Sequence, residues 1–152
     1  MYLISACLAG QPVRYDGKGY QFDAIQALIQ QKLAITVCPE MLGGLACPRE
    51  AAEISGGTAL DVLAGTAKVI TQKGTDATEA FLCGAYKTLH LAQKHQIHAV
   101  VLKEHSPSCG RNSIYDGTFS GAKTAGSGVT AALLQQHGFQ VMSELEFFES
   151  LK

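Results

Sequence analysis

Three cysteines occupy positions where thiol chemistry is expected: Cys7 in SACLAG, Cys38 in VCPE and Cys109 in HSPSCGRNS. Thiolates are nucleophiles and ligands for zinc and for iron–sulfur clusters. Pro39, which has no backbone N–H, ends the segment before it, and the small residues around Cys109 allow backbone N–H groups to point at a thiolate. We therefore interpret these three cysteines as metal or cluster ligands.

The other two cysteines give weaker signals. Cys47, in LACPRE, could be a fourth ligand, a resolving thiol or a residue without a chemical role. Cys83 falls inside a helical pattern beside apolar residues, so we predict that it is buried against the sheet. Because no C-x2-C pair occurs, a zinc ribbon and a thioredoxin-type motif are disfavoured. Spacing alone leaves open a zinc ion with water as the fourth ligand and a cubane cluster with one open iron.

Composition excludes several functional classes. The chain has 152 residues, of which 47% are hydrophobic and 16% charged, and its formal net charge is -1. These values predict one globular domain spanning residues 1–152, and they disfavour a nucleic-acid polymer or a membrane as partner. The start MYLISACLAG lacks the features of a secretory signal, so we expect a cytoplasmic protein in which five cysteines do not form a disulfide framework. Oligomeric state is not indicated.

Strand-like and helix-like segments alternate along the chain. The expected elements are strands at residues 2–6, 34–37, 67–70, 98–103 and 139–142, and helices at residues 23–31, 76–95 and 129–136, with a final short helix. Asp76 with Glu79, and Ser143 with Glu146, resemble capping boxes. Long segments rich in glycine, proline or serine, residues 38–65 and 104–127, are expected to be functional loops.

This alternation predicts an α/β fold: a three-layer, Rossmann-like open sheet, mostly parallel, with helices on both faces. Ligands of such sheets bind beyond the carboxyl ends of the strands. Cys7 and Cys38 each directly follow a predicted strand, and Cys109 lies in the loop after a third. We therefore expect the three thiols to meet at one edge of the sheet.

Five sequence strings, spread over nearly the whole chain, together resemble the thiouracil desulfidase family. They are SACLAG, VRYDG, VCPEMLGGLACPREAAEI, KEHSPSCGRNSIYDGTFSG and GSGVTAALL. The resemblance implies a Rossmann-like fold and a 4Fe-4S cluster held by Cys7, Cys38 and Cys109, with one iron left open. It also implies a thiolated pyrimidine substrate, either free thiouracil or a 4-thiouridine nucleotide such as 4-thio-UMP. Cysteine is not usual at the position of Cys47 in this family.

The implied reaction is a non-redox desulfuration that yields the oxo pyrimidine and hydrogen sulfide. An open iron would polarise the thiocarbonyl sulfur as a Lewis acid. Glu40, behind the rigid Pro39, is our candidate general base for the attacking water, and the resemblance also gives this glutamate a catalytic role. Ser106 is our candidate proton donor. A turn or helix cap is the alternative role for both residues.

Substrate-binding candidates are less specific. Gly126, Ser127 and Gly128 open a predicted helix whose free N–H groups could hold a phosphate, although an ordinary helix-opening turn explains them equally well. Arg14 and Lys103 could bind an anionic substrate or balance a cluster. Further cations in the predicted loops, more typical of paired surface charges, are Arg49, Arg111 and Lys123. Among the histidines, only His105 lies beside a candidate ligand loop.

Two alternative functions remain open from the residues themselves. One is a zinc-dependent hydrolase that uses the same three cysteines. The other is a non-enzymatic iron–sulfur or thiol sensor module in which Cys47 is the resolving thiol. Brown visible absorption separates a cluster from colourless zinc, and turnover of a thiolated pyrimidine separates an enzyme from a sensor.

Overall fold

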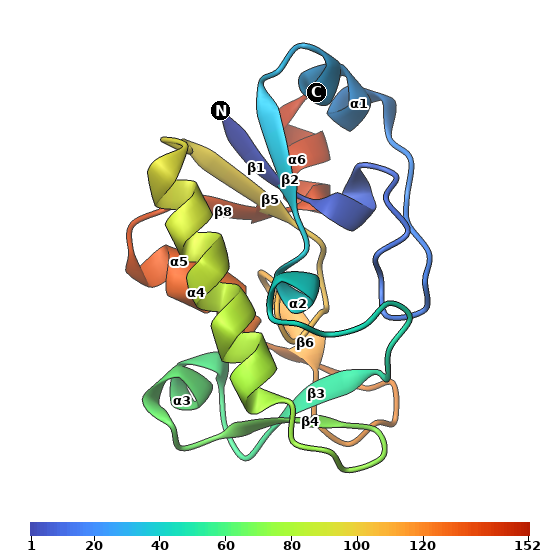
Figure 1. The fold of residues 1–152 in the computed structure, drawn as a ribbon, viewed down its shortest axis with the longest axis vertical. Coiled ribbons are helices and arrows are strands. Elements are labelled where there is room, and N and C mark those ends of the chain that lie inside the picture. The colour runs from blue at the N-terminus through green and yellow to red at the C-terminus, as the bar shows by residue number, and fades with distance from the viewer.

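A four-stranded parallel sheet forms the upper half of the molecule (Figure 1). The computed structural model describes residues 1–152. The strand order is β2 (Ala34–Val37), β1 (Tyr2–Ser5), β5 (Ala99–Leu102) and β8 (Val141–Ser143), and every neighbouring pair is parallel. The sheet therefore has the parallel arrangement that the sequence predicted.

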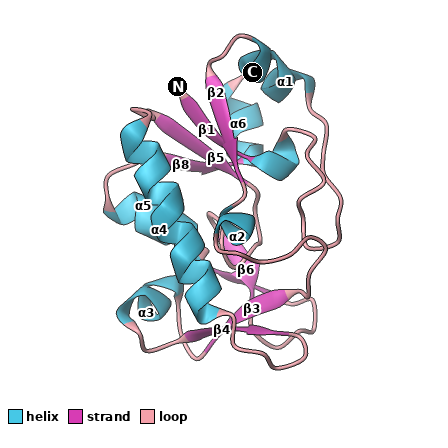
Figure 2. Ribbon diagram, in the orientation of Figure 1, coloured by secondary structure: helices cyan, strands magenta, loops and turns pink.

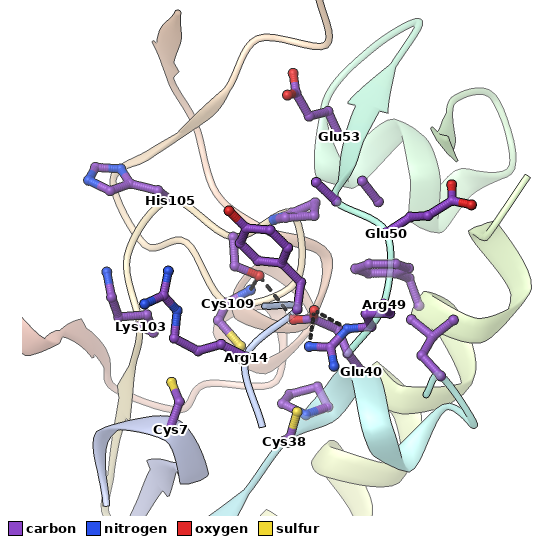
Figure 3. A pocket seen from close by; sticks show the side chains of 18 of the residues that line it. Cys7, Arg14, Cys38, Glu40, Arg49, Glu50, Glu53, Lys103, His105 and Cys109 are labelled. Atoms are coloured by element: carbon purple, nitrogen blue, oxygen red, sulfur yellow. Dashed lines mark hydrogen bonds and ion pairs between the residues drawn. The ribbon is translucent and has the colours of Figure 1, made fainter. Parts of the chain in front are cut away.

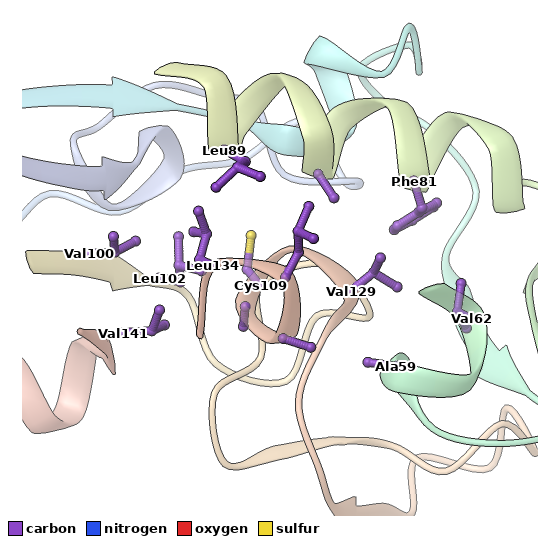
Figure 4. Packing of buried hydrophobic residues seen from close by; sticks show 14 of the residues in the cluster. Ala59, Val62, Phe81, Leu89, Val100, Leu102, Cys109, Val129, Leu134 and Val141 are labelled. Atoms are coloured by element: carbon purple, nitrogen blue, oxygen red, sulfur yellow. The ribbon is translucent and has the colours of Figure 1, made fainter. Parts of the chain in front are cut away.

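Helices cover both faces of this sheet, as the alternation of side chains requires. On one face, Leu3 and Val100 pack into the larger core with α4 (Thr78–Lys94) and α5 (Val129–Gln136) (Figure 4). On the other face, Ile4 and Val101 pack with α1 (Asp23–Gln30) and α6 (Glu144–Ser150). The predicted three-layer α/β fold is confirmed.

Small elements build the lower half of the molecule (Figure 2). Strand β3 pairs antiparallel with β4, and β6 pairs antiparallel with β7. These strands are β3 (Ala52–Ser55), β4 (Lys68–Thr71), β6 (Ser113–Tyr115) and β7 (Lys123–Ala125), with the short helix α3 (Ala59–Ala64) beside them. Two further short helices follow strands of the parallel sheet: η1 (Ala6–Leu8) after β1 and α2 (Pro39–Leu42) after β2. None of the helices has the length and the apolar character that crossing a bilayer requires.

The predicted loop at residues 38–65 is wrong in part. It contains α2, β3 and α3, each only four to six residues long and separated by glycine-rich turns, so no periodicity was visible. The strand predicted at residues 67–70 exists as β4, but it pairs with β3 outside the main sheet. The pairing depends on tertiary contacts that a local pattern does not reveal.

Two further predictions, both about helix α4, are wrong. It begins at Thr78 without a side-chain cap, and the Asp76 carboxylate accepts the N–H of Thr78 at 2.9 Å instead of forming a box with Glu79. Cys83 is exposed rather than buried, because the buried face of α4 runs through residues such as Phe81 and Ala85. The capping box of Ser143 and Glu146 at α6 is confirmed.

Candidate active site

A cavity of about 660 Å³ opens at the carboxyl end of the parallel sheet, between the two halves of the molecule. Cys7, Cys38 and Cys109 all line it, and their side chains lie on the same side of the cavity in Figure 3. The parallel topology therefore places three cysteines that are distant in sequence around one cavity.

Strand ends position the first two cysteines. Cys7 lies in η1 directly after β1, and Cys38 is the N-cap residue of α2 directly after β2. The two strands pair in a register that sets Ser5 opposite Val37, so the residues that follow both strands emerge side by side. Helix α2 packs against α4 at Gly43 and Gly84, where a β-carbon on either glycine would collide with backbone.

A buried carboxylate shapes the loop that carries Cys109. Glu104, 6% exposed, accepts the N–H groups of Arg111 at 2.6 Å and Asn112 at 2.9 Å, so it ties the start of the loop to its end. Its own N–H donates to the Glu144 carboxylate at 2.8 Å. Burial alone would raise the pKa of Glu104, but these N–H donors lower it overall, and the carboxylate stays charged.

The start of α5 supports the same loop. The N–H groups of Gly128 and Val129 donate to the carbonyls of Gly110 and Pro107, both at 2.7 Å. A β-carbon on Gly128 would lie 2.7 Å from the Cys109 nitrogen. Gly126, Ser127 and Gly128 are not among the residues that line the cavity. The structure thus gives this segment a packing role, and it does not support the predicted phosphate site.

The three thiols are costly to ionise without a cation. Burial, followed by the charges of Cys38 and Glu40, raises the pKa of Cys7 to about 12. Burial is also the main cause that raises the pKa of Cys38 and that of Cys109, and Glu40 adds to both. Since a coordinating metal deprotonates its thiols outright, this donor set suits a cationic centre rather than free thiolates.

The carboxylate of Glu40 reaches the same cavity from α2. Its Oε1 accepts the Ser106 hydroxyl at 3.1 Å, and its Oε2 accepts Arg49 Nη2 at 2.7 Å (Figure 3). Ser106 Oγ in turn accepts the N–H groups of Ser108 at 3.0 Å and Cys109 at 3.1 Å. The two predicted catalytic residues therefore touch, and a hydrogen-bonded chain joins Glu40 to the Cys109 loop.

Comparisons with known proteins identify the family of this chain. The sequence profile of the 2-thiouracil desulfurase family matches residues 2–146. The chain belongs to that family. It is 53% identical over 151 residues to the uncharacterized protein YbbK of Bacillus subtilis (strain 168), covering 99% of this chain and 100% of YbbK. It also superimposes with a TM-score of 0.87 on a solved structure of the [4Fe-4S]-dependent thiouracil desulfidase TudS, at 43% identity over 97% of this chain and 93% of TudS.

Cationic side chains flank Cys7 in this desulfurase-family chain. Arg14 lies 4.9 Å from the ring centre of Tyr20, and Lys103 Nζ lies 5.5 Å from it. Both cations act to lower the pKa of Cys7 against the stronger effect of burial. Lys103 also pairs with Glu144 at 3.1 Å. Arg14 and Lys103 line the cavity where the sequence placed them.

Glu53 lines the cavity on the side of β3, and the sequence did not indicate it as a site residue. Glu53 on β3 is buried and accepts the N–H groups of Gly117 at 2.8 Å and Phe119 at 3.2 Å, so it holds the loop after β6 over the cavity. A lone glutamate in a short strand gives no local signal of this role. His105 also lines this cavity, and burial, then Lys123 and Lys103, lower its pKa.

The side chains of the site do not surround one metal-ion position. Zinc bonds its ligands at about 2.0–2.3 Å, so its thiolates must crowd around one point. No group of three His, Cys, Asp or Glu side chains is arranged to hold one metal ion. Cys47 lies outside the cavity lining, and its thiol donates to the carbonyl of Pro12 at 3.0 Å.

Proposed function

We propose that this chain is an iron–sulfur-dependent desulfidase that hydrolyses a thiolated uracil derivative, thiouracil or 4-thio-UMP, to the oxo form and hydrogen sulfide. One observation carries the proposal: three buried or half-buried thiols, from Cys7, Cys38 and Cys109, point into a cavity that also contains the linked pair Glu40 and Ser106. Family membership and the likeness to TudS support the same reaction.

The three cysteines are the proposed ligands of a 4Fe-4S cluster. The donor set fits, because all three thiols border one cavity and need a cationic centre in order to ionise. When bound, a cluster with three protein ligands keeps one iron open, which supplies a Lewis acid for a soft sulfur atom. Unpaired cysteines suit a reducing compartment, so we place the enzyme in the cytoplasm.

Glu40 is the proposed general base. A water molecule attacks the ring carbon of the thiocarbonyl, and Glu40 Oε1 takes its proton. Ser106 Oγ, hydrogen-bonded to Oε1 at 3.1 Å, can then pass a proton toward the leaving sulfur. Because its hydroxyl already donates to Glu40, Ser106 acts as a relay rather than as an independent acid. The net reaction consumes one water, and no electrons are transferred.

Arg14 and Lys103 are the proposed contacts for the polar or anionic part of the substrate. Their side chains are partly exposed, 27% for Arg14 and 22% for Lys103. Tyr20, whose ring lies near both cations, offers an aromatic face beside them. This cationic side of the cavity takes over the role that the sequence analysis gave to Gly126, Ser127 and Gly128.

The test is anaerobic reconstitution followed by measurement of sulfide release from thiouracil, 4-thiouridine and 4-thio-UMP. We expect brown protein that releases sulfide from at least one of these compounds. Glu40→Gln should keep the cluster and lose about 10²- to 10⁴-fold in kcat, the range for a general base. Unchanged turnover in Glu40→Gln contradicts the base assignment, and colourless protein with one zinc per chain contradicts the cluster.

A further inference from the structure

Arg49 makes more hydrogen bonds at the site than its loop position suggested. Its Nε and Nη2 both donate to Glu40 Oε2, at 3.2 Å and 2.7 Å. Its Nη1 donates to the carbonyls of Val13 at 3.1 Å and Ala46 at 3.2 Å. A guanidinium has five N–H donors, and four of them are used here. The guanidinium is therefore held by the Glu40 carboxylate on one side and by two backbone carbonyls on the other.

The environment excludes water from most of this contact. The Arg49 side chain is 8% exposed and that of Glu40 is 13% exposed. Burial alone would lower the pKa of Arg49, but the Glu40 carboxylate raises it overall, so the guanidinium remains charged. The backbone N–H of Arg49 also donates to the carbonyl of Tyr15 at 2.7 Å. This hydrogen bond attaches the backbone at Arg49 to the segment that contains Tyr15.

The two oxygens of Glu40 consequently have different surroundings. Oε2 receives two N–H groups from one planar guanidinium, whereas Oε1 receives only the Ser106 hydroxyl at 3.1 Å. A carboxylate held in this way cannot exchange its oxygens without breaking the paired contact. Only Oε1 keeps a lone pair for a proton from water.

We propose that Arg49 is a positioning residue that selects Oε1 of Glu40 as the basic atom and holds it against Ser106. This inference rests on the proposed function, because it assigns a partner to the proposed base. Arg49 acts through Glu40, because its guanidinium donates only to Glu40 and to backbone carbonyls. The planar fork matters as well as the charge: lysine keeps the charge but cannot place two fixed N–H groups on one oxygen.

Arg49→Lys is the first test. We expect kcat to fall by about 10- to 100-fold with KM changed less than about threefold, because a misdirected carboxylate slows chemistry without removing a substrate contact. Iron content and visible absorption should match the parent. Lys68→Arg is the control for a Lys–Arg exchange: Lys68 is exposed, pairs with Asp76 at 3.7 Å and is not among the cavity-lining residues, so its substitution should leave kcat unchanged.

A double-mutant cycle separates positioning from general support. Adding Arg49→Lys to Glu40→Gln should cost less than about twofold in kcat, because the partner through which Arg49 acts is already lost. A crystal structure of cluster-loaded Arg49→Lys supplies a readout other than activity. We expect the Oε1 atom of Glu40 to have left hydrogen-bonding distance of Ser106 Oγ.

Four results would overturn the proposal: kcat of Arg49→Lys within twofold of the parent, an effect confined to KM, full additivity with Glu40→Gln, or an unmoved Glu40 side chain. If Arg49→Lys does not load the cluster, Arg49 instead supports the ligand loops, and the positioning role is rejected. Parent protein that loads its cluster yet releases no sulfide contradicts the proposed function. In that case the crystal structure still decides whether Arg49 orients Glu40.

Discussion

The proposed ligands are positioned in two different ways. Cys7 and Cys38 follow adjacent parallel strands, and the register of β1 and β2 sets their separation. Cys109 lies seven residues beyond the end of β5, in a loop with no regular backbone pairing of its own. Two proposed ligands thus depend on the main sheet, whereas the third depends on a loop held by the Glu104 side chain and by the backbone at Gly128.

The difference shows where the site is vulnerable. Moving Cys7 or Cys38 requires a change in the central sheet, whose hydrogen bonds and core are shared by the whole fold. Moving Cys109 requires only the loss of Glu104 or of the close approach at Gly128. We therefore expect changes around the Cys109 loop to affect cluster binding more than their cost in stability suggests.

Removal of a proposed ligand should reduce cluster content and activity more than any other change. The reduction should be the same for a cysteine that follows a strand of the sheet and for the cysteine in the loop. Cys7→Ser and Cys109→Ser should each lose the intact cluster and at least about a thousandfold in kcat/KM, equivalent to about 4 kcal/mol of transition-state stabilisation. Iron content, visible absorption and sulfide release measure this. Cys83→Ser, on the exposed face of α4, is the control and should behave as the parent does. Full cluster content in Cys109→Ser would remove that cysteine from the ligand set.

Gly128→Ala tests the packing that supports the loop. The added β-carbon would lie 2.7 Å from the Cys109 nitrogen, so the loop must move. We expect a loss of about 1–3 kcal/mol in unfolding free energy together with reduced cluster retention. Denaturant titration and iron content measure the two effects.

Ser127→Ala is the matched control for Gly128→Ala, because it changes the adjacent residue without adding volume. We expect it to preserve stability, cluster content and KM for 4-thio-UMP. A raised KM for this nucleotide but not for thiouracil would instead support the predicted phosphate contact. Gly128→Ala with unchanged cluster retention would show that the loop tolerates displacement.

Glu104→Gln should give a comparable loss of unfolding free energy and should also change its pH dependence. Buried hydrogen bonds to a charged group are worth about 1.5–3 kcal/mol, so unfolding free energy at pH 7 should fall by about that much. The pKa of Glu104 is lowered in the folded chain, so its stabilisation is present above the unfolded pKa and is lost as pH falls through the folded value.

Denaturant titrations at neutral and acidic pH test this prediction. The parent should lose the Glu104 contribution on acidification, whereas Glu104→Gln should show a flatter profile. The control is Glu79→Gln, an exposed glutamate without a hydrogen bond, which should keep the profile of the parent. Parallel profiles for the parent and Glu104→Gln would show that the carboxylate charge is not used in the fold.

Local signals predicted much of the parallel sheet and singled out Cys7, Cys38 and Cys109, which line the cavity. The predicted ends of the four strands of this sheet lie within two residues of the observed ends, because buried strands appear in the sequence as short apolar runs. Cys7 and Cys38 were identified because a strand and a glycine or proline flank each of them. Both effects depend on neighbours in the sequence, so a single chain is enough to reveal them.

Contacts between distant segments were not predictable in this way. Cys83 was placed on the wrong face because the helix has apolar residues beside both faces, and only packing decides between them. Arg49 was grouped with surface cations, although its partner Glu40 is visible nine positions earlier. The pairing of β3 with β4 also joins residues that are distant in the sequence, and so does the hydrogen bond from the Gly117 N–H to Glu53. No local pattern predicts either contact.

Ser143→Ala should have the smallest effect and tests the other side of the comparison. Ser143 caps α6 by accepting the N–H of Glu146 at 3.1 Å, and loss of such a cap costs about 1 kcal/mol. Helix α6 packs on the sheet face that carries the smaller core, and Ser143 is not a cavity-lining residue. We therefore expect lower unfolding free energy with unchanged iron content and kcat. Cluster loss in Ser143→Ala equal to that in Gly128→Ala would show that stability alone, and not the Cys109 loop, controls cluster binding.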